Sequence, residues 1–176
     1  LNRAATQEEI HELAVEGVMG AVGVARAAIL LRDEAGVMRF RAARGLSSAY
    51  RQAVEGHTPW ASDAADASPV LISDTRLDSG LAELRAAIEA EGIHALAFIP
   101  IVSDGRLAGK FMLYYDAPHA FGGAEIEAAM AVAGHVGFAL ERNRALQQLR
   151  EERQLFVDGP AVVFKWKAER GWPVEY

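Results

Sequence analysis

Two β-type stretches, residues 95–102 and 107–115, flank the short segment Ser103-Asp104-Gly105-Arg106. The dipeptide Asp-Gly favours the tight turn of a β-hairpin, because both residues tolerate the positive φ angles that such a turn requires. The first stretch is also the longest apolar run in the chain. The pair therefore predicts two central antiparallel strands, around which the other elements have to pack.

Apolar spacing elsewhere predicts further helices and strands. Met38, Phe40 and Ala42 alternate with arginines, so we expect these three side chains on one face of a strand. Gly56 and Gly92 are expected to end helices, since glycine readily adopts the left-handed conformation. In chain order, the elements predicted before the central hairpin are a helix over 7–21, a hairpin of 27–31 and 37–42, a short helix over 47–56, a strand over 69–72 and a helix over 79–92.

A proline-free segment of good helix formers follows the hairpin, from Ala124 to about Gln154. A helix of that length would extend for about 46 Å, whereas a domain of this size has a radius of gyration of about 16 Å. We therefore expect its far end to contact something outside the domain, or nothing. The residues predicted to make dimer and relay contacts are Ile10, Leu13, Val132, Val136, Ala139 and Leu146.

The composition excludes several classes of function. The chain has 18 basic and 24 acidic residues, and its net charge of −6 disfavours binding to nucleic acids and to anionic membranes. It has no cysteine, which excludes disulfides, thiolate metal sites and thiol catalysis. No apolar run approaches the roughly 20 residues of a membrane span, and no signal-peptide pattern is visible. We expect a cytoplasmic protein.

No catalytic or metal-binding pattern stands out. The five histidines lack the close helical spacing of a zinc motif, and no Gly-x-Ser-x-Gly nucleophile elbow occurs. Gly17, Gly20 and Gly23 close a predicted helix, whereas a phosphate-binding glycine run follows a strand and opens a helix. The sequence therefore predicts neither an enzyme nor a metal site.

Five short motifs occur in the order that is typical of one family of domains. They are Ala43-Arg44-Gly45-Leu46-Ser47, Ile99-Pro100-Ile101, Gly105-Arg106-Leu107-Ala108-Gly109, the pair Phe121 and Glu125, and Ala139-Leu140-Glu141-Arg142-Asn143. Over about residues 5–149 the chain resembles the GAF family of sensory domains. The order of elements predicts an α+β fold. The resemblance implies a GAF-like antiparallel sheet of about five to six strands, helices on both faces and a long C-terminal signalling helix.

Residues 155–176 return to β-type content and include Trp166, Trp172 and Tyr176. So short a segment cannot bury these aromatic side chains alone, and we expect the sequence to end inside a second domain. This tail resembles the beginning of a PAS domain. The expected organisation is a GAF sensory domain over 1–149, then the end of a connecting helix and the truncated start of a PAS domain over 150–176.

The resemblance places a small-molecule cavity between one face of the sheet and the loops of residues 57–80. An apolar cavity with a few polar groups is the general form of such a site. For Phe98 and Met112, strand alternation alone would also explain burial in an ordinary core. The expected ligand-binding residues are Trp60, Asp74, Arg76, Phe98, Met112 and Tyr114.

The cofactors of the family fit this sequence poorly. Members that bind cyclic nucleotides carry an Asn, Lys, Phe, Asp, Glu signature; here Phe121 and Glu125 fit, and Ala124 stands where the acid is expected. Members that bind bilin or reduce methionine sulfoxide use cysteines, which this chain lacks. A haem-binding member needs one buried histidine, here His94 or His57, but a lone histidine is more often an ordinary polar residue. We expect no cofactor.

The resemblance implies a multidomain bacterial signalling protein, usually a sensor histidine kinase or a diguanylate cyclase, with its catalytic module downstream. Two functions are open: a regulatory domain that senses an unknown small molecule, and a ligand-free dimerisation and signal-relay module. Both use a homodimer through the terminal helices and a last helix that leads to downstream PAS and output domains. A cavity of a few hundred Å³ favours the sensor, and a sealed core favours the relay module.

Overall fold

The computed structural model describes residues 7–61, 64, 66–158, 165–166 and 174–175. The chain forms two compact units, Leu1–Glu141 and Arg142–Tyr176. The elements of the first unit are α1 (Gln7–Val22), β1 (Arg26–Arg32), β2 (Met38–Arg44), α2 (Ser48–Val54), β3 (Val70–Ile72), the 3₁₀ helix η1 (Ser79–Leu84), α3 (Arg85–Ala90), β4 (Ala95–Ser103), β5 (Arg106–Tyr115) and the first part of α4 (Gly123–Asp158).

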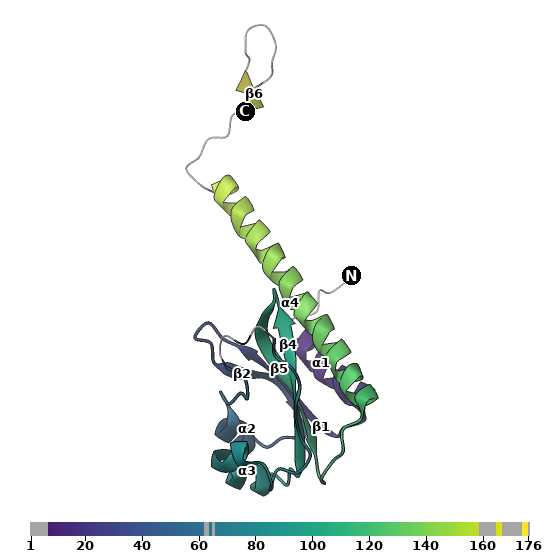
Figure 1. The fold of residues 1–176 in the computed structure, drawn as a ribbon. Helices are drawn as coiled ribbons and strands as arrows, with labels where there is room; N and C mark the ends of the chain where they lie inside the picture. Colours follow the sequence, from purple (N-terminus) through teal and green to yellow (C-terminus); the bar gives the residue numbers. More distant parts are fainter. Residues whose placement is uncertain (1–6, 62–63, 65, 159–164, 167–173, 176) are drawn as a thin grey trace. The chain divides into compact units, whose positions relative to one another are not determined.

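One five-stranded antiparallel sheet organises the first unit, in the order β2-β1-β5-β4-β3 (Figure 1). The predicted central hairpin is β4 and β5, and each of these strands has a neighbour on both sides. At its turn, Asp104 and Gly105 have φ angles of 52° and 69°, as a type I′ turn requires. The predicted α+β fold with an antiparallel sheet is confirmed.

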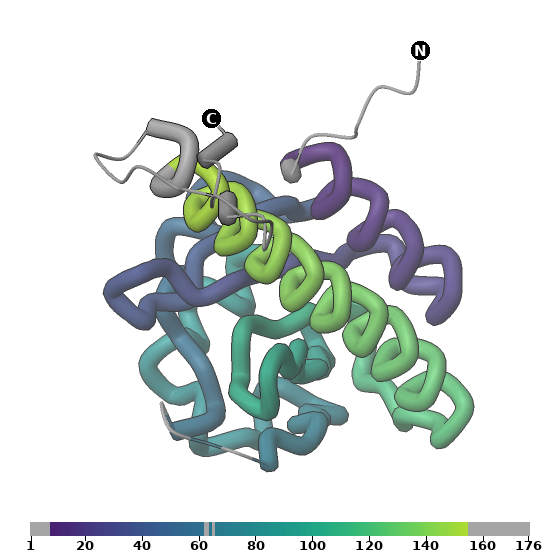
Figure 2. The backbone as a smooth tube through the Cα atoms, turned by 90° about the horizontal axis from the view of Figure 1, so that it is seen from above, coloured from purple at the N-terminus to yellow at the C-terminus, as the bar shows by residue number. Residues whose placement is uncertain are grey.

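Helices cover both faces of this sheet. One face carries α1 and the first part of α4, which lie side by side (Figures 1 and 2). The other face carries α2, η1 and α3. We call these the α1/α4 face and the α2/α3 face. Because side chains alternate along a strand, Ile99 and Phe111 belong to the α1/α4 core, whereas Leu30, Phe98 and Met112 belong to the α2/α3 core.

The prediction that Met38, Phe40 and Ala42 share one face was wrong. Ile29 pairs with Ala42 but Leu30 pairs with Phe40, so the register shifts by one residue between them. Such a bulge reverses the alternation of side chains. Met38 and Phe40 therefore pack on the α2/α3 face, and Ala42 packs in the α1/α4 core.

The single helix predicted over 79–92 is two segments. The first is the 3₁₀ helix η1, at whose start the Asp78 carboxylate accepts a hydrogen bond from the Gly80 N–H at 2.8 Å. The second is the short helix α3. Gly92 follows it with a φ of 68°, as predicted for a residue that ends a helix.

Helix α4 has 36 residues and no break at Ala139. In the first unit, its residues Ala129, Ala133 and Val136 belong to the α1/α4 core. In the second unit, β6 (Lys165–Trp166) pairs with β7 (Val174–Glu175). Of the tail expected to begin a PAS domain, residues 155–158 end α4, and residues 159–164, 167–173 and 176 lie outside the described residues. None of the helices described here is long and apolar enough to cross a membrane.

Candidate ligand pocket

A pocket lies on the α2/α3 face, between the sheet and the helices that cover it. The sheet forms its floor, through side chains that alternation turns to this face. The segment after α2 contributes His57, and the short helices form the roof. The residues that line it are Leu30, Phe40, Tyr50, Val54, His57, Leu81, Leu84, Ile88, Leu96, Phe98, Lys110, Met112 and Tyr114.

The pocket is narrow in this conformation. The space free of atoms amounts to about 310 Å³, including the opening to solvent, but the centre of a water-sized molecule could occupy only about 20 Å³ of it. Measured in that way, one water needs about 10–15 Å³. A larger ligand would require the roof to move. The volume of this pocket is therefore intermediate: it is smaller than the cavity expected of a sensor, but the interior is not sealed as expected of a relay module.

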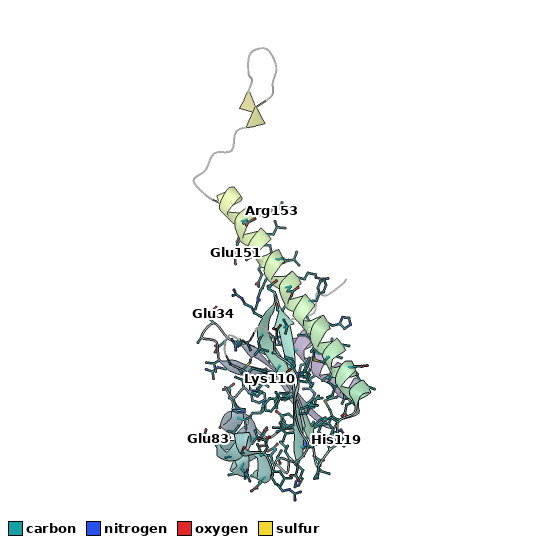
Figure 3. The ribbon with its side chains drawn as sticks, viewed as in Figure 1. Glu34, Glu83, Lys110, His119, Glu151 and Arg153 are labelled. Carbon is teal, nitrogen blue, oxygen red and sulfur yellow. The ribbon has the colours of Figure 1, made fainter. Side chains whose placement is uncertain are left out.

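Lys110 is the charged residue of the pocket floor, in the middle of the sheet (Figure 3). The residue is 2% exposed, and its Nζ donates a hydrogen bond to the His57 carbonyl at 2.5 Å. The Nζ atom also lies 4.9 Å from the centre of the Phe98 ring. Burial lowers the pKa of Lys110 to about 7, because a low-dielectric interior disfavours the ammonium form.

Two tyrosines and a histidine add polar groups to the pocket. Tyr50 of α2 meets Tyr114 of β5 edge to face, with 5.7 Å between ring centres. Burial raises the pKa of Tyr50 to about 12 and that of Tyr114 well above its usual range, so both hydroxyls stay protonated. Burial and the charge of Lys110 lower the pKa of His57. The described lining thus contains the Lys110 amine and no carboxylate.

Three of the six predicted ligand-binding residues line this pocket: Phe98, Met112 and Tyr114. Trp60 lies beside it and meets the Phe98 ring edge to face, with 6.2 Å between ring centres. The Trp60 indole N–H donates to the Ser68 carbonyl at 2.9 Å. Trp60 therefore holds the segment that follows α2 against Phe98 of β4 and is not itself part of the described lining.

Asp74 and Arg76 do not belong to the described lining. They bind each other through two side-chain hydrogen bonds, Nε to Oδ1 at 2.9 Å and Nη2 to Oδ2 at 2.6 Å. The Arg76 guanidinium lowers the pKa of Asp74 to about 2. Each of these side chains thus has its ion-pair partner in the same turn, and neither needs a group of the pocket to satisfy its charge.

Sequence reasoning missed Lys110 and Tyr50. A signal for Lys110 was available, since Lys110, Met112 and Tyr114 are spaced by two on a central strand and must share a face. Tyr50 carries no comparable signal, because α2 is too short for a clear apolar stripe.

Of the two histidines considered as haem ligands, His57 lines the pocket and His94 does not. His94 precedes β4, where its backbone N–H donates to the Tyr115 carbonyl at 2.9 Å. Among the residues that the structure describes, no group of three or more acidic or histidine side chains could hold a metal ion.

The predicted relay residues divide into buried and exposed positions. Val136 is 8% exposed and packs in the α1/α4 core, so its own chain already covers it. Leu13 is 62% exposed and Leu146 is 43% exposed. Phe138, which was not predicted, is 66% exposed on α4. The other members of the predicted set are half-buried: Ile10, Val132 and Ala139.

A second polar cluster fixes the start of α4, near His119 (Figure 3). The Glu125 carboxylate accepts hydrogen bonds from the Tyr115 hydroxyl and from the Gly122 N–H. Nε2 of His119 lies 3.0 Å from each carboxylate oxygen of Glu125. The His119 and Tyr115 rings stack with 4.0 Å between centres, and Phe121 packs edge-on against both. Phe121 and Glu125 thus hold the connection between β5 and α4.

Known proteins share this fold. The family model for the GAF domain (GAF_2) matches residues 4–141. A domain of a protein assigned as a two-component sensor histidine kinase from Sinorhizobium meliloti 1021 is 44% identical with a TM-score of 0.76, over 84% of this chain and 99% of that chain. No curated protein matches the sequence.

Two structures of lower identity show the same fold. A GAF domain assigned to a sensor histidine kinase from Pseudomonas syringae pv. tomato has 15% identity and a TM-score of 0.59, over 84% of this chain and 83% of that one. The blue-light-absorbing form of the Thermosynechococcus elongatus PixJ GAF domain has 17% identity and a TM-score of 0.64, over 82% and 90%. With the family model matching most of its length, the chain belongs to the GAF domain family.

Proposed function

We propose that this GAF domain is the regulatory, small-molecule-sensing segment of a multidomain bacterial signal-transduction protein. The parent is a sensor histidine kinase or a diguanylate cyclase, and the 44% identity to the S. meliloti domain supports the first. In this proposal the domain regulates and does not catalyse, and it acts in the cytoplasm. Residues 1–149 are the sensory domain, and residues 150–176 are the end of a connecting helix and the start of a PAS domain.

The observation that carries this proposal is a buried lysine in a mostly apolar pocket. Placing an amine at Lys110 costs stability, because burial penalises a charged or unsatisfied polar group. A methionine or leucine would fill the same position in a core at no such cost. An apolar pocket with a few converging polar groups is instead the usual form of a small-molecule site.

Strand β5 offers a route from the pocket to α4. Its residues Met112 and Tyr114 line the pocket, whereas Phe111, Leu113 and Tyr115 lie in or against the α1/α4 core. A ligand that displaces β5 on one face therefore changes the packing of α4 on the other. The Glu125 cluster ties the end of β5 to the start of α4 and would transmit the same shift.

Thermal-shift measurements with a metabolite library test the sensing function. Ligands that bind the folded state raise the melting temperature. We expect hits with wild type that disappear in Val54→Phe, which fills the pocket, and persist in Leu71→Phe, which places the same aromatic ring at an exposed position of β3. A hit list that is the same for all three proteins, or no hits with wild type, would contradict the proposal.

The alternative function is a ligand-free dimerisation and signal-relay module. The apolar side chains of Leu13 and Phe138 favour it, because both are mostly exposed on the helices of the α1/α4 face. The narrowness of the pocket also favours it. Under this alternative, two copies pack through their terminal helices, and α4 transmits a change of register or rotation. It predicts signalling in the parent protein that Val54→Phe leaves unchanged.

A further inference from the structure

The lysine of the pocket is incompletely satisfied within the described part of the chain. Its ammonium group has three N–H donors, and one of them is used by the His57 carbonyl at 2.5 Å. The Phe98 ring adds a weak attraction to a cation. The described lining holds no Asp or Glu that would balance the charge.

A carboxylate supplies what Lys110 lacks. It carries one negative charge, and its two oxygens accept strong charge-assisted hydrogen bonds from an ammonium group. The protonated hydroxyls of Tyr50 and Tyr114 interact with each other, which leaves one hydroxyl donor for a ligand in the same pocket. Apart from His57, the rest of the wall is apolar, including Leu84 and Ile88, and would enclose a hydrocarbon or aromatic body.

The same lining disfavours other ligand classes. An amine or another cation would meet Lys110 and find no described carboxylate. A phosphate ester usually needs several donors, such as arginines or a helix N-terminus. No arginine belongs to the described lining, and the first turn of α2 already has its N–H at Tyr50 satisfied by the Ser47 hydroxyl.

We propose that the pocket binds a small monocarboxylate with an apolar body, whose carboxylate is held by Lys110 Nζ and whose body lies against Phe98, Met112 and Tyr114. This inference rests on the proposed sensing function and specifies its ligand class. Entry of such a ligand requires the roof of α2 and η1–α3 to separate from the sheet.

Binding of a carboxylate then involves a proton. With the pocket free, burial holds the pKa of Lys110 at about 7, so the amine is mostly neutral at pH 8. A bound carboxylate favours the ammonium form and draws in one proton. The other charges that act on the pocket's titratable groups are Glu83 on His57, and Glu91 and Arg26 on the two tyrosines.

Isothermal titration calorimetry at pH 8 tests this inference, with phenylacetate and hexanoate as probes and their amides as neutral matches. Measurements in buffers of different ionisation enthalpy report proton uptake. For wild type we expect each acid to bind at least tenfold more tightly than its amide, with uptake approaching one proton. In Lys110→Met the preference and the uptake should vanish, and in Arg51→Met, which removes an exposed charge outside the lining, both should persist.

The outcomes separate the ligand class from the sensing function. If wild type and Lys110→Met each bind the acid and its amide with equal affinity, the proposal that the ligand is a carboxylate is overturned, and the proposal of a ligand pocket stands. Absence of any binding, by these probes and by the metabolite library, would overturn both. Asp63 lies outside the described residues, so Asp63→Asn is included. Proton uptake that appears only in Asp63→Asn would show that the chain's own carboxylate serves Lys110, and would overturn the inference.

Discussion

Gly137 of α4 lies directly against the backbone carbonyl of Val102 in β4, and no Cβ atom would fit between them. At the other two glycines of α4 in the first unit, Gly123 and Gly134, a Cβ atom would meet nothing within 4 Å. The close contact with Val102 explains why glycine, a residue with poor helix propensity, occupies position 137 of the helix.

Gly137→Ala should destabilise the domain by about 1–3 kcal/mol, because the added methyl group forces α4 and β4 apart. Gly134→Ala is the matched control, since a Cβ there meets nothing within 4 Å. Helix propensity predicts that this control stabilises the protein by up to about 1 kcal/mol. Urea denaturation of both variants measures the difference. Equal effects at the two glycines would show that the contact with Val102 does not restrain α4.

Glu125→Gln should cost about 1 kcal/mol, because a half-buried acceptor of charge-assisted hydrogen bonds is weakened. Glu127→Gln, at an exposed position of the same helix, should change little. Burial opposes ionisation of Glu125, but the hydrogen bonds from Tyr115 and His119 outweigh it and lower its pKa. The contribution is therefore complete above the ordinary glutamate pKa and is lost as the pH falls through the lowered value. Denaturation at pH 3 and pH 7 should show a smaller difference between wild type and Glu125→Gln at the lower pH.

Lys110→Met should be more stable than wild type near pH 7, and this advantage should shrink as the pH rises from 7 to 9. The unfolded chain keeps Lys110 protonated in this window, whereas burial holds the folded-state pKa at about 7. The unfolded state therefore binds more protons, and the stability of wild type rises with pH, by up to about 1.4 kcal/mol per unit. Urea denaturation across this range measures it, with Arg51→Met as the control. A difference independent of pH would mean that Lys110 stays charged in the fold.

Phe138→Asp should weaken self-association at least tenfold in sedimentation velocity, if the α1/α4 face joins two chains. Leu77→Asp is the matched control, because Leu77 is 83% exposed outside that face. Val136 is unsuitable for this test, since its removal from the core would destabilise the fold itself. A monomeric wild type, or equal effects of the two substitutions, would argue against the terminal-helix dimer.

Most of the fold could be predicted from the sequence, because strand alternation and turn residues report on local geometry. The hairpin of β4 and β5 followed from Asp104 and Gly105, and the length of α4 followed from its lack of proline. Ala42 was assigned to the wrong face, because no feature of the sequence marks the bulge between Ile29 and Leu30.

The candidate site was harder to predict, because it depends on which side chains meet after folding. The resemblance to the GAF family placed Met112 and Tyr114 at the pocket, and strand alternation could then have placed Lys110 on the same face. It could not reveal that Asp74 and Arg76 satisfy each other. Nor could the periodicity of α4 separate Val136, which its own sheet covers, from Phe138, which is exposed.

The central claim is that a small molecule enters the α2/α3 face and not the α1/α4 face. Methyl NMR tests it directly, because Leu30, Ile88, Leu96 and Met112 report on the first face, and Val18, Ile29, Ile99 and Leu113 report on the second. With phenylacetate or hexanoate added to the intact domain, the account predicts large shifts in the first group and smaller ones, passed through β5, in the second. Shifts confined to the second group, or none in either, would contradict it.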